Sequence, residues 1–244
     1  MIKRVNAFLM LVLSVLLYGS TYVASSCLAQ LLCADWIVGA MMLSYVLSIV
    51  FLAFFYKNKD RTPLLFPDSQ SSKKCLYFLP MCPAVISNVF FVDRGTMSVG
   101  SFMLILAVSA GEELLFRYYL LGALGKRGAV FGALLSSALF SVMHLANLLS
   151  NSDIAFVLLQ AVTAFAIGLC FSLTVVITKR VGVCILIHFL INLSGMGELR
   201  VGWHAASAVC IGVYLLYALH LFRYLRRKTI SLSNNEVDKE GNMT

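Results

Sequence analysis

The chain repeats apolar runs of about 20 residues, and this feature constrains its fold more than any other. A run of that length lets an α-helix cross a hydrocarbon core about 30 Å thick. Of the 244 residues, 60% are hydrophobic and only 12% are charged, against roughly 25% charged in soluble domains. Because lipid offers the backbone no hydrogen-bond partners, each run has to satisfy its own polar groups as a helix. The sequence therefore predicts an all-α, polytopic transmembrane helical bundle.

About eight spans can be drawn along the chain. They are Ala7–Leu32, Trp36–Tyr56, Cys75–Val92, Met97–Leu124, Ala129–Leu149, Ile154–Thr178, Val181–Ser194 and Trp203–Leu225. The run at 181–194 is short for a full crossing, and Pro80 and Pro83 should kink or break the run at 75–92. Seven spans are the alternative count.

Basic residues are distributed very unevenly between the two ends of these spans. If the amino terminus is cytoplasmic, fifteen Lys and Arg residues up to position 228 fall in cytoplasmic segments, and only Arg94 and Arg200 fall in external ones. Cytoplasmic loops carry such an excess, so both termini are predicted to be cytoplasmic and the span count even. The asymmetry also explains the net charge of +8. We therefore expect membrane lipids as partners and no nucleic acid.

The chain divides into one large unit and a short tail. Residues 1–228 are predicted to form the bundle, with a polar cytoplasmic loop at Lys57–Lys74. The Ser- and Asn-rich residues 229–244 are predicted to be a disordered cytoplasmic tail. The first apolar run exceeds the 7–15 residues of a signal-peptide core, so we interpret it as a retained span and not as a cleaved signal.

The predicted span at 97–124 contains three ionisable residues, Glu112, Glu113 and Arg117. Each such group costs about 2.5–3.5 kcal/mol at membrane depth on insertion scales, so these groups persist mainly where they serve a function inside the protein. Glu113 and Arg117 have the i,i+4 spacing and order that favour a helical ion pair. That pair would leave Glu112, about 100° round the helix, as the unpaired carboxylate.

Two later spans carry His144 and the pair His188 and Asn192, the latter two at i,i+4 on one helical face. Carboxylates, imidazoles and an amide together meet the needs of hydrolysis. A poorly solvated carboxylate can take a proton from water near neutral pH, and the other groups can orient water or donate to an oxyanion. The depths of these residues in their spans differ by up to ~12 Å, which helix tilt or a broken helix would have to absorb.

Each residue alone also has a structural interpretation. Intramembrane His and Asn side chains commonly hydrogen-bond between helices, and Glu113 with Arg117 could serve only to stabilise the bundle. The combination of two acids, two imidazoles and an amide on three spans exceeds what packing needs. His204 and His220 have no such companions and are interpreted as span-end residues.

The segment Glu112-Glu113-Leu-Leu-Phe-Arg117 resembles a known motif. It is similar to the Glu-Glu-x-x-x-Arg motif of the CAAX prenyl proteases and bacteriocin-processing enzymes, the CPBP or Abi family. A single match of this length would be weak evidence.

Two further segments resemble the remaining motifs of that family. Phe140-Ser-Val-Met-His144 is similar to Phe-x-x-x-His, and His188-Phe-Leu-Ile-Asn192 is similar to His-x-x-x-Asn. The three motifs occur in the family's order within a core at about 101–194. Three matches in order make a specific signal.

The resemblance implies an intramembrane endopeptidase with the site residues Glu112, Glu113, Arg117, His144, His188 and Asn192. By this resemblance, Glu112 would activate water with assistance from His144. His188 and Asn192 would form the oxyanion side, while the remaining acid and the arginine would position Glu112. Glutamate-dependent hydrolysis without a cofactor is preferred because the chain lacks His-Glu-x-x-His. The alternative is a zinc ion bound by Glu112, His144 and His188.

The expected substrate is a small peptide, leader or membrane-anchored protein. Short loops and a strong positive-inside pattern favour a bacterial plasma-membrane protein, whose relatives are associated with peptide maturation, bacteriocin self-immunity and quorum sensing. The alternative function is a non-catalytic regulatory or immunity protein that binds a membrane partner. A transporter with an acidic proton relay is a third hypothesis, disfavoured by the lack of a visible repeat.

Overall fold

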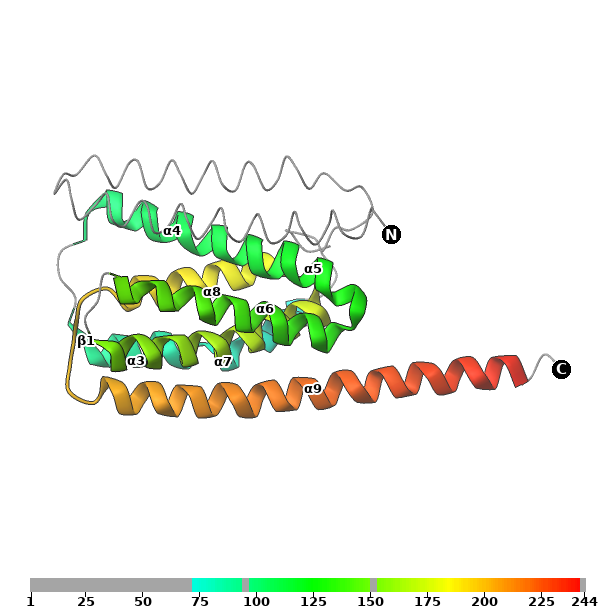
Figure 1. Ribbon diagram of the computed structural model, residues 1–244. Helices are drawn as coiled ribbons and strands as arrows, with labels where there is room; N and C mark the ends of the chain where they lie inside the picture. Colours follow the sequence, from blue (N-terminus) through cyan, green and yellow to red (C-terminus); the bar gives the residue numbers. More distant parts are fainter. Residues whose placement is uncertain (1–71, 94–96, 150–152, 242–244) are drawn as a thin grey trace.

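The computed structural model describes residues 72–93, 97–149 and 153–241, and nearly all of the backbone in these ranges is helical (Figure 1). The elements are η1 (Ser72–Met81), α3 (Pro83–Phe91), β1 (Val92–Asp93), α4 (Val99–Glu113), η2 (Leu114–Leu120), α5 (Leu121–Leu124), η3 (Gly125–Arg127), α6 (Ala129–His144), η4 (Leu145–Leu149), α7 (Ile154–Thr178), α8 (Val181–Ser194), β2 (Glu198–Leu199) and α9 (Trp203–Gly241). The predicted spans at 7–32 and 36–56 lie outside the described residues.

Four helical segments in the described ranges are long and apolar enough to cross a membrane, namely Val99–Leu124, Ala129–Leu148, Ile154–Thr178 and Trp203–Arg227. Two shorter apolar helices, Cys75–Phe91 and Val181–Ser194, accompany them. These segments follow the predicted runs closely, so the chain is an all-α, polytopic membrane protein. The total of eight spans and the cytoplasmic termini stay predictions.

Proline divides the run at 75–91 as the sequence predicted. Its first part, η1, is a 3₁₀-helix with Pro80 inside it, and α3 begins anew at Pro83. A proline at the first position of a helix lacks only an N–H that would have no partner there, so Pro83 starts α3 without loss. The run is thus two short helices.

Helix α7 lies at the centre of the described bundle. It packs against α6 and α9, while α4 packs against α8 (Figure 1). Its sequence is apolar on nearly all sides, because one face packs into the bundle while Leu158 and Val162 on another face are exposed. The largest core side chains around it include Phe78, Met81, Phe171 and Tyr214.

The helical segment at 99–124 changes its winding directly after the two acids. Residues Leu114–Leu120 form a π-helix, in which the N–H of Leu121 bonds to the carbonyl oxygen of Phe116, five residues earlier. Wider π turns are rare and occur frequently at functional sites. The sequence analysis required a tilted or broken helix to align the polar residues, and this π-helical segment interrupts the α-helical winding there.

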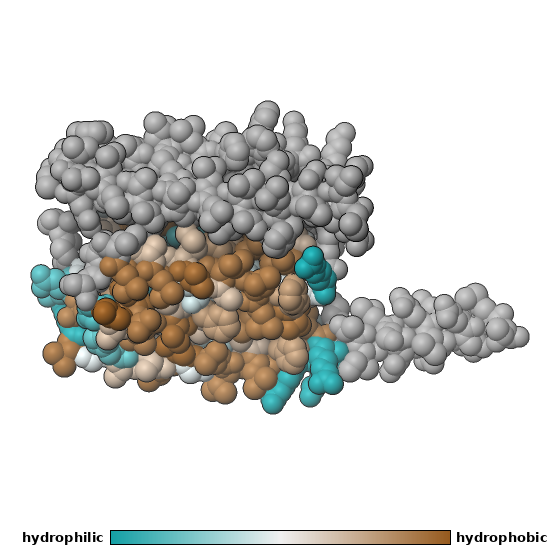
Figure 2. All heavy atoms as spheres, viewed as in Figure 1, coloured by the Kyte–Doolittle hydropathy of each residue, from teal (hydrophilic) through white to brown (hydrophobic). Residues whose placement is uncertain are grey.

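The outer surface of the bundle is apolar in its middle and polar at its ends, as expected of a membrane protein. In Figure 2, hydrophobic residues cover the middle of the visible face, and hydrophilic residues gather at its two ends. At one end β1 pairs antiparallel with β2, and Asp93 forms an exposed ion pair with Arg200 at 3.1 Å. Gly197 precedes β2 with a φ of 143°, and a side chain there would collide with the Asp93 carbonyl. The pairing of β1 with β2 therefore needs glycine at this position.

Helix α9 differs from the prediction at its carboxyl end. It continues to Gly241 through most of the segment that the sequence predicted to be disordered, and it projects away from the bundle (Figure 1). Residues 229–240 contain no proline or glycine. Extending an existing helix avoids the cost of nucleation, so a polar segment without breakers can continue the helix that precedes it. The division at residue 228 into bundle and tail stays a prediction.

Candidate active site

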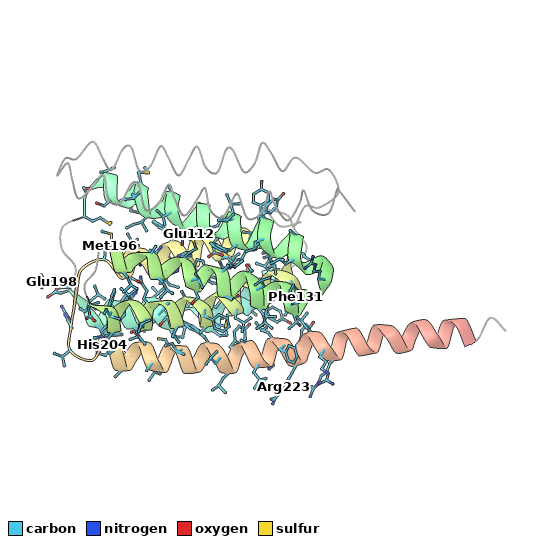
Figure 3. All side chains as sticks on the ribbon, viewed as in Figure 1. Glu112, Phe131, Met196, Glu198, His204 and Arg223 are labelled. Atoms are coloured by element: carbon cyan, nitrogen blue, oxygen red, sulfur yellow. The ribbon has the colours of Figure 1, made fainter. Side chains whose placement is uncertain are left out.

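The neighbouring acids at the end of α4 lie in different surroundings. The side chain of Glu113 is fully buried, whereas 15% of the Glu112 side chain is exposed. Successive side chains on a helix point about 100° apart, so one can face the protein interior while the other faces a cavity. Glu112 lies near the middle of the bundle (Figure 3).

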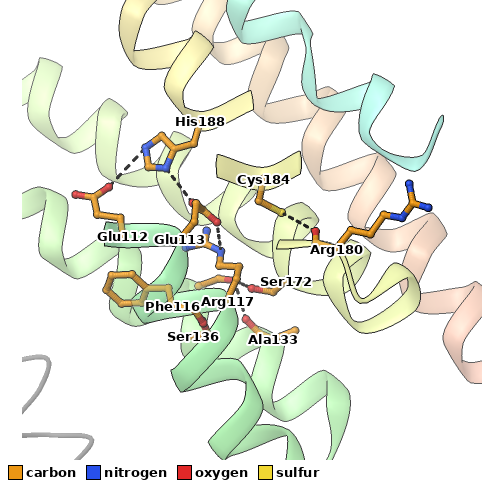
Figure 4. Close-up of polar contacts among 11 residues, drawn as sticks. Glu112, Glu113, Phe116, Arg117, Ala133, Ser136, Ser172, Arg180, Cys184 and His188 are labelled. Carbon is orange, nitrogen blue, oxygen red and sulfur yellow. Dashed lines mark hydrogen bonds and ion pairs between the residues drawn. The ribbon is translucent and has the colours of Figure 1, made fainter. Parts of the chain in front are cut away.

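Glu113, Arg117 and His188 form a cluster that we call the buried ionic core. The Glu113 carboxylate has its Oε2 atom 3.2 Å from Nε of Arg117 and its Oε1 atom 2.9 Å from Nδ1 of His188 (Figure 4). The predicted i,i+4 pair is confirmed. Both oxygens of Glu113 are therefore engaged with cationic or hydrogen-bonding partners, and the cluster joins α8 to the end of α4.

The guanidinium group of Arg117 is enclosed by aromatic rings. Its Cζ atom lies 4.2 Å from the ring centre of Phe140 and 5.6 Å from that of Phe171. Rings at these distances attract a cation, most strongly where water is excluded. Gly168 of α7 makes the space, because a Cβ atom there would lie 2.9 Å from Nη2 of Arg117. Aromatic faces and a glycine thus accommodate a charge deep in an apolar bundle.

His188 connects the buried ionic core to Glu112. Its Nε2 atom lies 3.5 Å from Oε2 of Glu112, so the acid that the sequence left unpaired has an imidazole beside it. An ionised carboxylate only accepts hydrogen bonds, so Nδ1 of His188 is the donor to Glu113. This bond fixes the ring and directs Nε2 toward Glu112. A carboxylate that orients an imidazole in this way is a recurring device in catalytic and metal sites.

Glu112, His144 and Asn192 form what we call the cavity face, because all three line a cavity of about 130 Å³. Nδ1 of His144 donates to the carbonyl oxygen of Phe140 at 2.9 Å, which leaves Nε2 as the atom available for chemistry. Nδ2 of Asn192 donates to Oγ of Ser109 at 3.1 Å, and this bond holds the amide in place.

A larger cavity of about 470 Å³ adjoins the first, since Val108, His144, Gln160 and Asn192 line both. Its other walls come mainly from apolar residues of α4, α7 and α8, and it reaches Leu199 of β2 and Trp203 of α9. The arrangement is a polar chamber beside an apolar one. An apolar chamber with a few converging polar groups is the usual form of a ligand site.

The part of the chain that contains these residues is similar to a known protein family. Residues 95–194 match the family described as Rce1-like, type II CAAX prenyl endopeptidase. Over these residues, the chain is similar to the type II CAAX prenyl endopeptidases. The matched segment runs from just before α4 to the end of α8 and includes both clusters. No curated protein matched the chain.

All six predicted residues gather in one region of the matched segment. Direct contacts join Glu112, Glu113, Arg117 and His188. His144 of α6 and Asn192 of α8 line the small cavity together with Glu112. The resemblance implied an oxyanion role for His188. The structure adds a hydrogen bond between this ring and Glu113, which the motif spacing did not reveal. His204 and His220 line neither cavity, as expected of span-end residues.

Three further residues of the site were missed by the sequence analysis: Ser109, Gln160 and Gly168. Gln160 could have been noticed, because an amide side chain is unusual within an apolar run such as 154–178. Ser109 and Gly168 carry no such signal, since small residues occur throughout membrane helices for packing reasons.

The alternative prediction for this segment was a zinc ion bound by Glu112, His144 and His188. Within 72–93, 97–149 and 153–241, no three His, Cys, Asp or Glu side chains are grouped so that they could hold a metal ion. We derive no catalytic step through a metal.

Proposed function

We propose that this protein is an intramembrane endopeptidase that hydrolyses a peptide bond with water activated by Glu112. The observation that carries this proposal is the cavity face, where a partly exposed carboxylate shares a small chamber with an imidazole and an amide. The match to a family of endopeptidases supports the same reaction class. Glu113 is unsuited to this role because it is sealed from solvent and both its oxygens are engaged.

The proposed reaction uses the residues of both clusters. Glu112, assisted by Nε2 of His144, takes a proton from water, and the oxygen bonds to the carbonyl carbon of the substrate. Asn192 donates a hydrogen bond to the oxyanion that forms, and His188 donates a second one from Nε2 in its doubly protonated form. The carbon–nitrogen bond then breaks, and the proton held by Glu112 moves to the leaving nitrogen. The products are a new carboxyl terminus and a new amino terminus, so atoms and protons balance.

Glu113 and Arg117 have a supporting role in this proposal. They touch no part of the polar cavity and act through His188, whose ring they fix from the side opposite Glu112. A preorganised donor costs no reorganisation when the oxyanion forms, which is why such second contacts matter for rate. They are positioning residues.

The apolar chamber of about 470 Å³ favours a hydrophobic substrate. Its lining matches apolar side chains of a peptide or of a membrane-anchored segment. We propose a plasma-membrane location in a bacterium and a role in peptide maturation, bacteriocin self-immunity or quorum sensing. We also propose that no metal participates, so that activity survives dialysis against a strong chelator. A loss that added zinc reverses would contradict this part.

The decisive experiment compares wild type with Glu112→Gln in lipid nanodiscs, using a pool of short apolar peptides capped at both ends and analysed by mass spectrometry. Glu198→Gln is the matched control, since Glu198 is exposed on β2 at the end of the bundle, away from Glu112 (Figure 3). We expect wild type and the control to cleave the same peptides and Glu112→Gln to cleave none.

Complementation of a strain that lacks the gene gives the physiological counterpart. Failure of Glu112→Gln and His144→Ala at normal membrane expression supports catalysis. Rescue by both variants, together with no cleaved peptide, would favour the alternative of a regulatory or immunity protein that acts by binding.

A further inference from the structure

Gln160 of α7 lies where the two chambers meet. It lines both the polar cavity with Glu112 and the larger apolar cavity. An amide in a membrane-embedded helix needs hydrogen-bond partners, because an unsatisfied polar group in apolar surroundings is costly. The partners of Gln160 therefore indicate what this position does.

One of those partners is Asn147 of η4, one turn beyond His144. Nδ2 of Asn147 donates to Oε1 of Gln160 at 2.8 Å. This bond occupies the carbonyl oxygen of Gln160 and so fixes the direction of its NH₂ group. Among the described residues, the NH₂ group of Gln160 itself has no hydrogen-bond acceptor. Gln160 thus has donors available at the junction.

Thr163, about one turn further along α7, provides a contrast. It lines the apolar cavity too, but its hydroxyl donates to the carbonyl oxygen of Leu159 at 2.8 Å. Such a bond to the preceding turn satisfies the hydroxyl within its own helix. Two polar side chains on the same helix therefore differ in whether a donor remains for a ligand.

We propose that Gln160 binds a backbone carbonyl oxygen of the substrate where the peptide passes from the apolar chamber to Glu112, and that Asn147 is the positioning residue for this contact. The inference rests on the endopeptidase function proposed above. Apolar walls can accept a substrate's side chains, yet they leave its backbone carbonyls without donors, and a buried carbonyl needs one. An oriented amide at the junction supplies that donor one residue or a few residues from the scissile bond.

The test is an ester scan of a capped apolar peptide that wild type cleaves. Each backbone amide outside the scissile bond is replaced in turn by an ester, whose carbonyl is a weaker acceptor. We expect one position at which the ester lowers kcat/KM of wild type about tenfold, as loss of a typical hydrogen bond implies. In Gln160→Leu that position should become insensitive, with the loss on the amide peptide mainly in KM. Thr163→Val is the matched control and should keep the wild-type ester profile.

Asn147→Ala keeps Gln160 and covers the case in which Gln160→Leu fails to fold. It should weaken the same ester effect without shifting it to another position. Cleavage by Gln160→Leu with unchanged kcat/KM and the wild-type ester profile would overturn this inference and leave the endopeptidase function standing. Absence of any wild-type cleavage of the peptide pool would overturn the proposed function, and this inference with it.

Discussion

The buried ionic core and the cavity face lie side by side, yet the bundle treats their carboxylates in opposite ways. Glu113 has both oxygens engaged and no exposed surface. Glu112, the next residue, keeps part of its side chain open to a cavity that it shares with His144 and Asn192. The difference shows how one doubled motif can supply both a structural anchor and a reactive group, because adjacent helical positions face different surroundings.

His188 makes the two regions depend on each other. Its Nδ1 atom belongs to the buried ionic core and its Nε2 atom approaches Glu112. Damage to the core should therefore reach the cavity through the orientation of one imidazole ring. Damage to the cavity face should leave the core intact. This asymmetry can be tested by measuring stability and activity separately for each variant.

The largest expected effect is on activity in Glu112→Gln. The substitution keeps the shape of the side chain but removes the base, and general acid–base catalysis is worth about 10²–10⁴-fold in rate. We expect kcat to fall by that factor while the thermal midpoint in nanodiscs stays within the error of wild type. A large drop in the midpoint would show that Glu112 is also an anchor, and the contrast between the two acids would collapse.

The next largest effect is on stability when the ion pair of Glu113 and Arg117 is broken. Removing one partner of a buried pair typically costs about 3–5 kcal/mol, because the other charge is left without compensation. Glu113→Ala and Arg117→Ala should each lower the chemical-denaturation midpoint strongly. The double variant Glu113→Ala with Arg117→Ala should lose less than the sum of the two single changes. Additive losses would mean that the two side chains stabilise the bundle independently.

The sequence predicted the helices well where local signals coincide with the apolar pattern. Helix α7 begins after Asp153, whose side chain accepts a hydrogen bond from the N–H of Phe156 at 3.0 Å, and it ends at Lys179 in a left-handed conformation with a φ of 60°. Both ends match the predicted run at 154–178. Capping and hydropathy are local properties, so they can be read without knowledge of neighbours.

The parts that could not be predicted depend on contacts between distant segments. Motif spacing predicted the candidate site residues and the pairing of Glu113 with Arg117. It did not predict the bond between Glu113 and His188, two residues that are 75 positions apart. The π-helix after Glu113 is not marked by any distinctive composition, and its contacts with α6 and α8 involve segments distant in the sequence. The sequence analysis did not predict the helical segment that reaches Gly241, because the composition of a tail carries no information about the helix that it continues.

A smaller effect on the buried ionic core is expected from Gly168→Ala. The new Cβ atom would lie 2.9 Å from Nη2 of Arg117 and 3.2 Å from the Phe140 ring, so the guanidinium group has to move within a closed space. Such overpacking typically costs about 1–3 kcal/mol. Because Arg117 positions Glu113 and hence His188, kcat should fall as well. Gly212→Ala on α9 is the control, since nothing lies within 4 Å of a Cβ atom there. Equal behaviour of the two variants would show that space around Arg117 is not limiting.

The smallest effect concerns the cavity face and should appear in rate alone. Ser109→Ala removes the acceptor that holds the Asn192 amide at 3.1 Å. A hydrogen bond of this kind is worth about 0.5–1.5 kcal/mol, so kcat should fall by about two- to tenfold as the amide loses its orientation. Ser137→Ala deletes another fully buried hydroxyl, which donates to the carbonyl oxygen of Ala133 within its own helix at 2.7 Å. Both variants should lose similar stability, but only Ser109→Ala should turn over more slowly, because only its hydroxyl reaches a residue of the cavity. If the two variants slow the reaction equally, the loss comes from general loosening of the bundle, and Asn192 needs no support from α4.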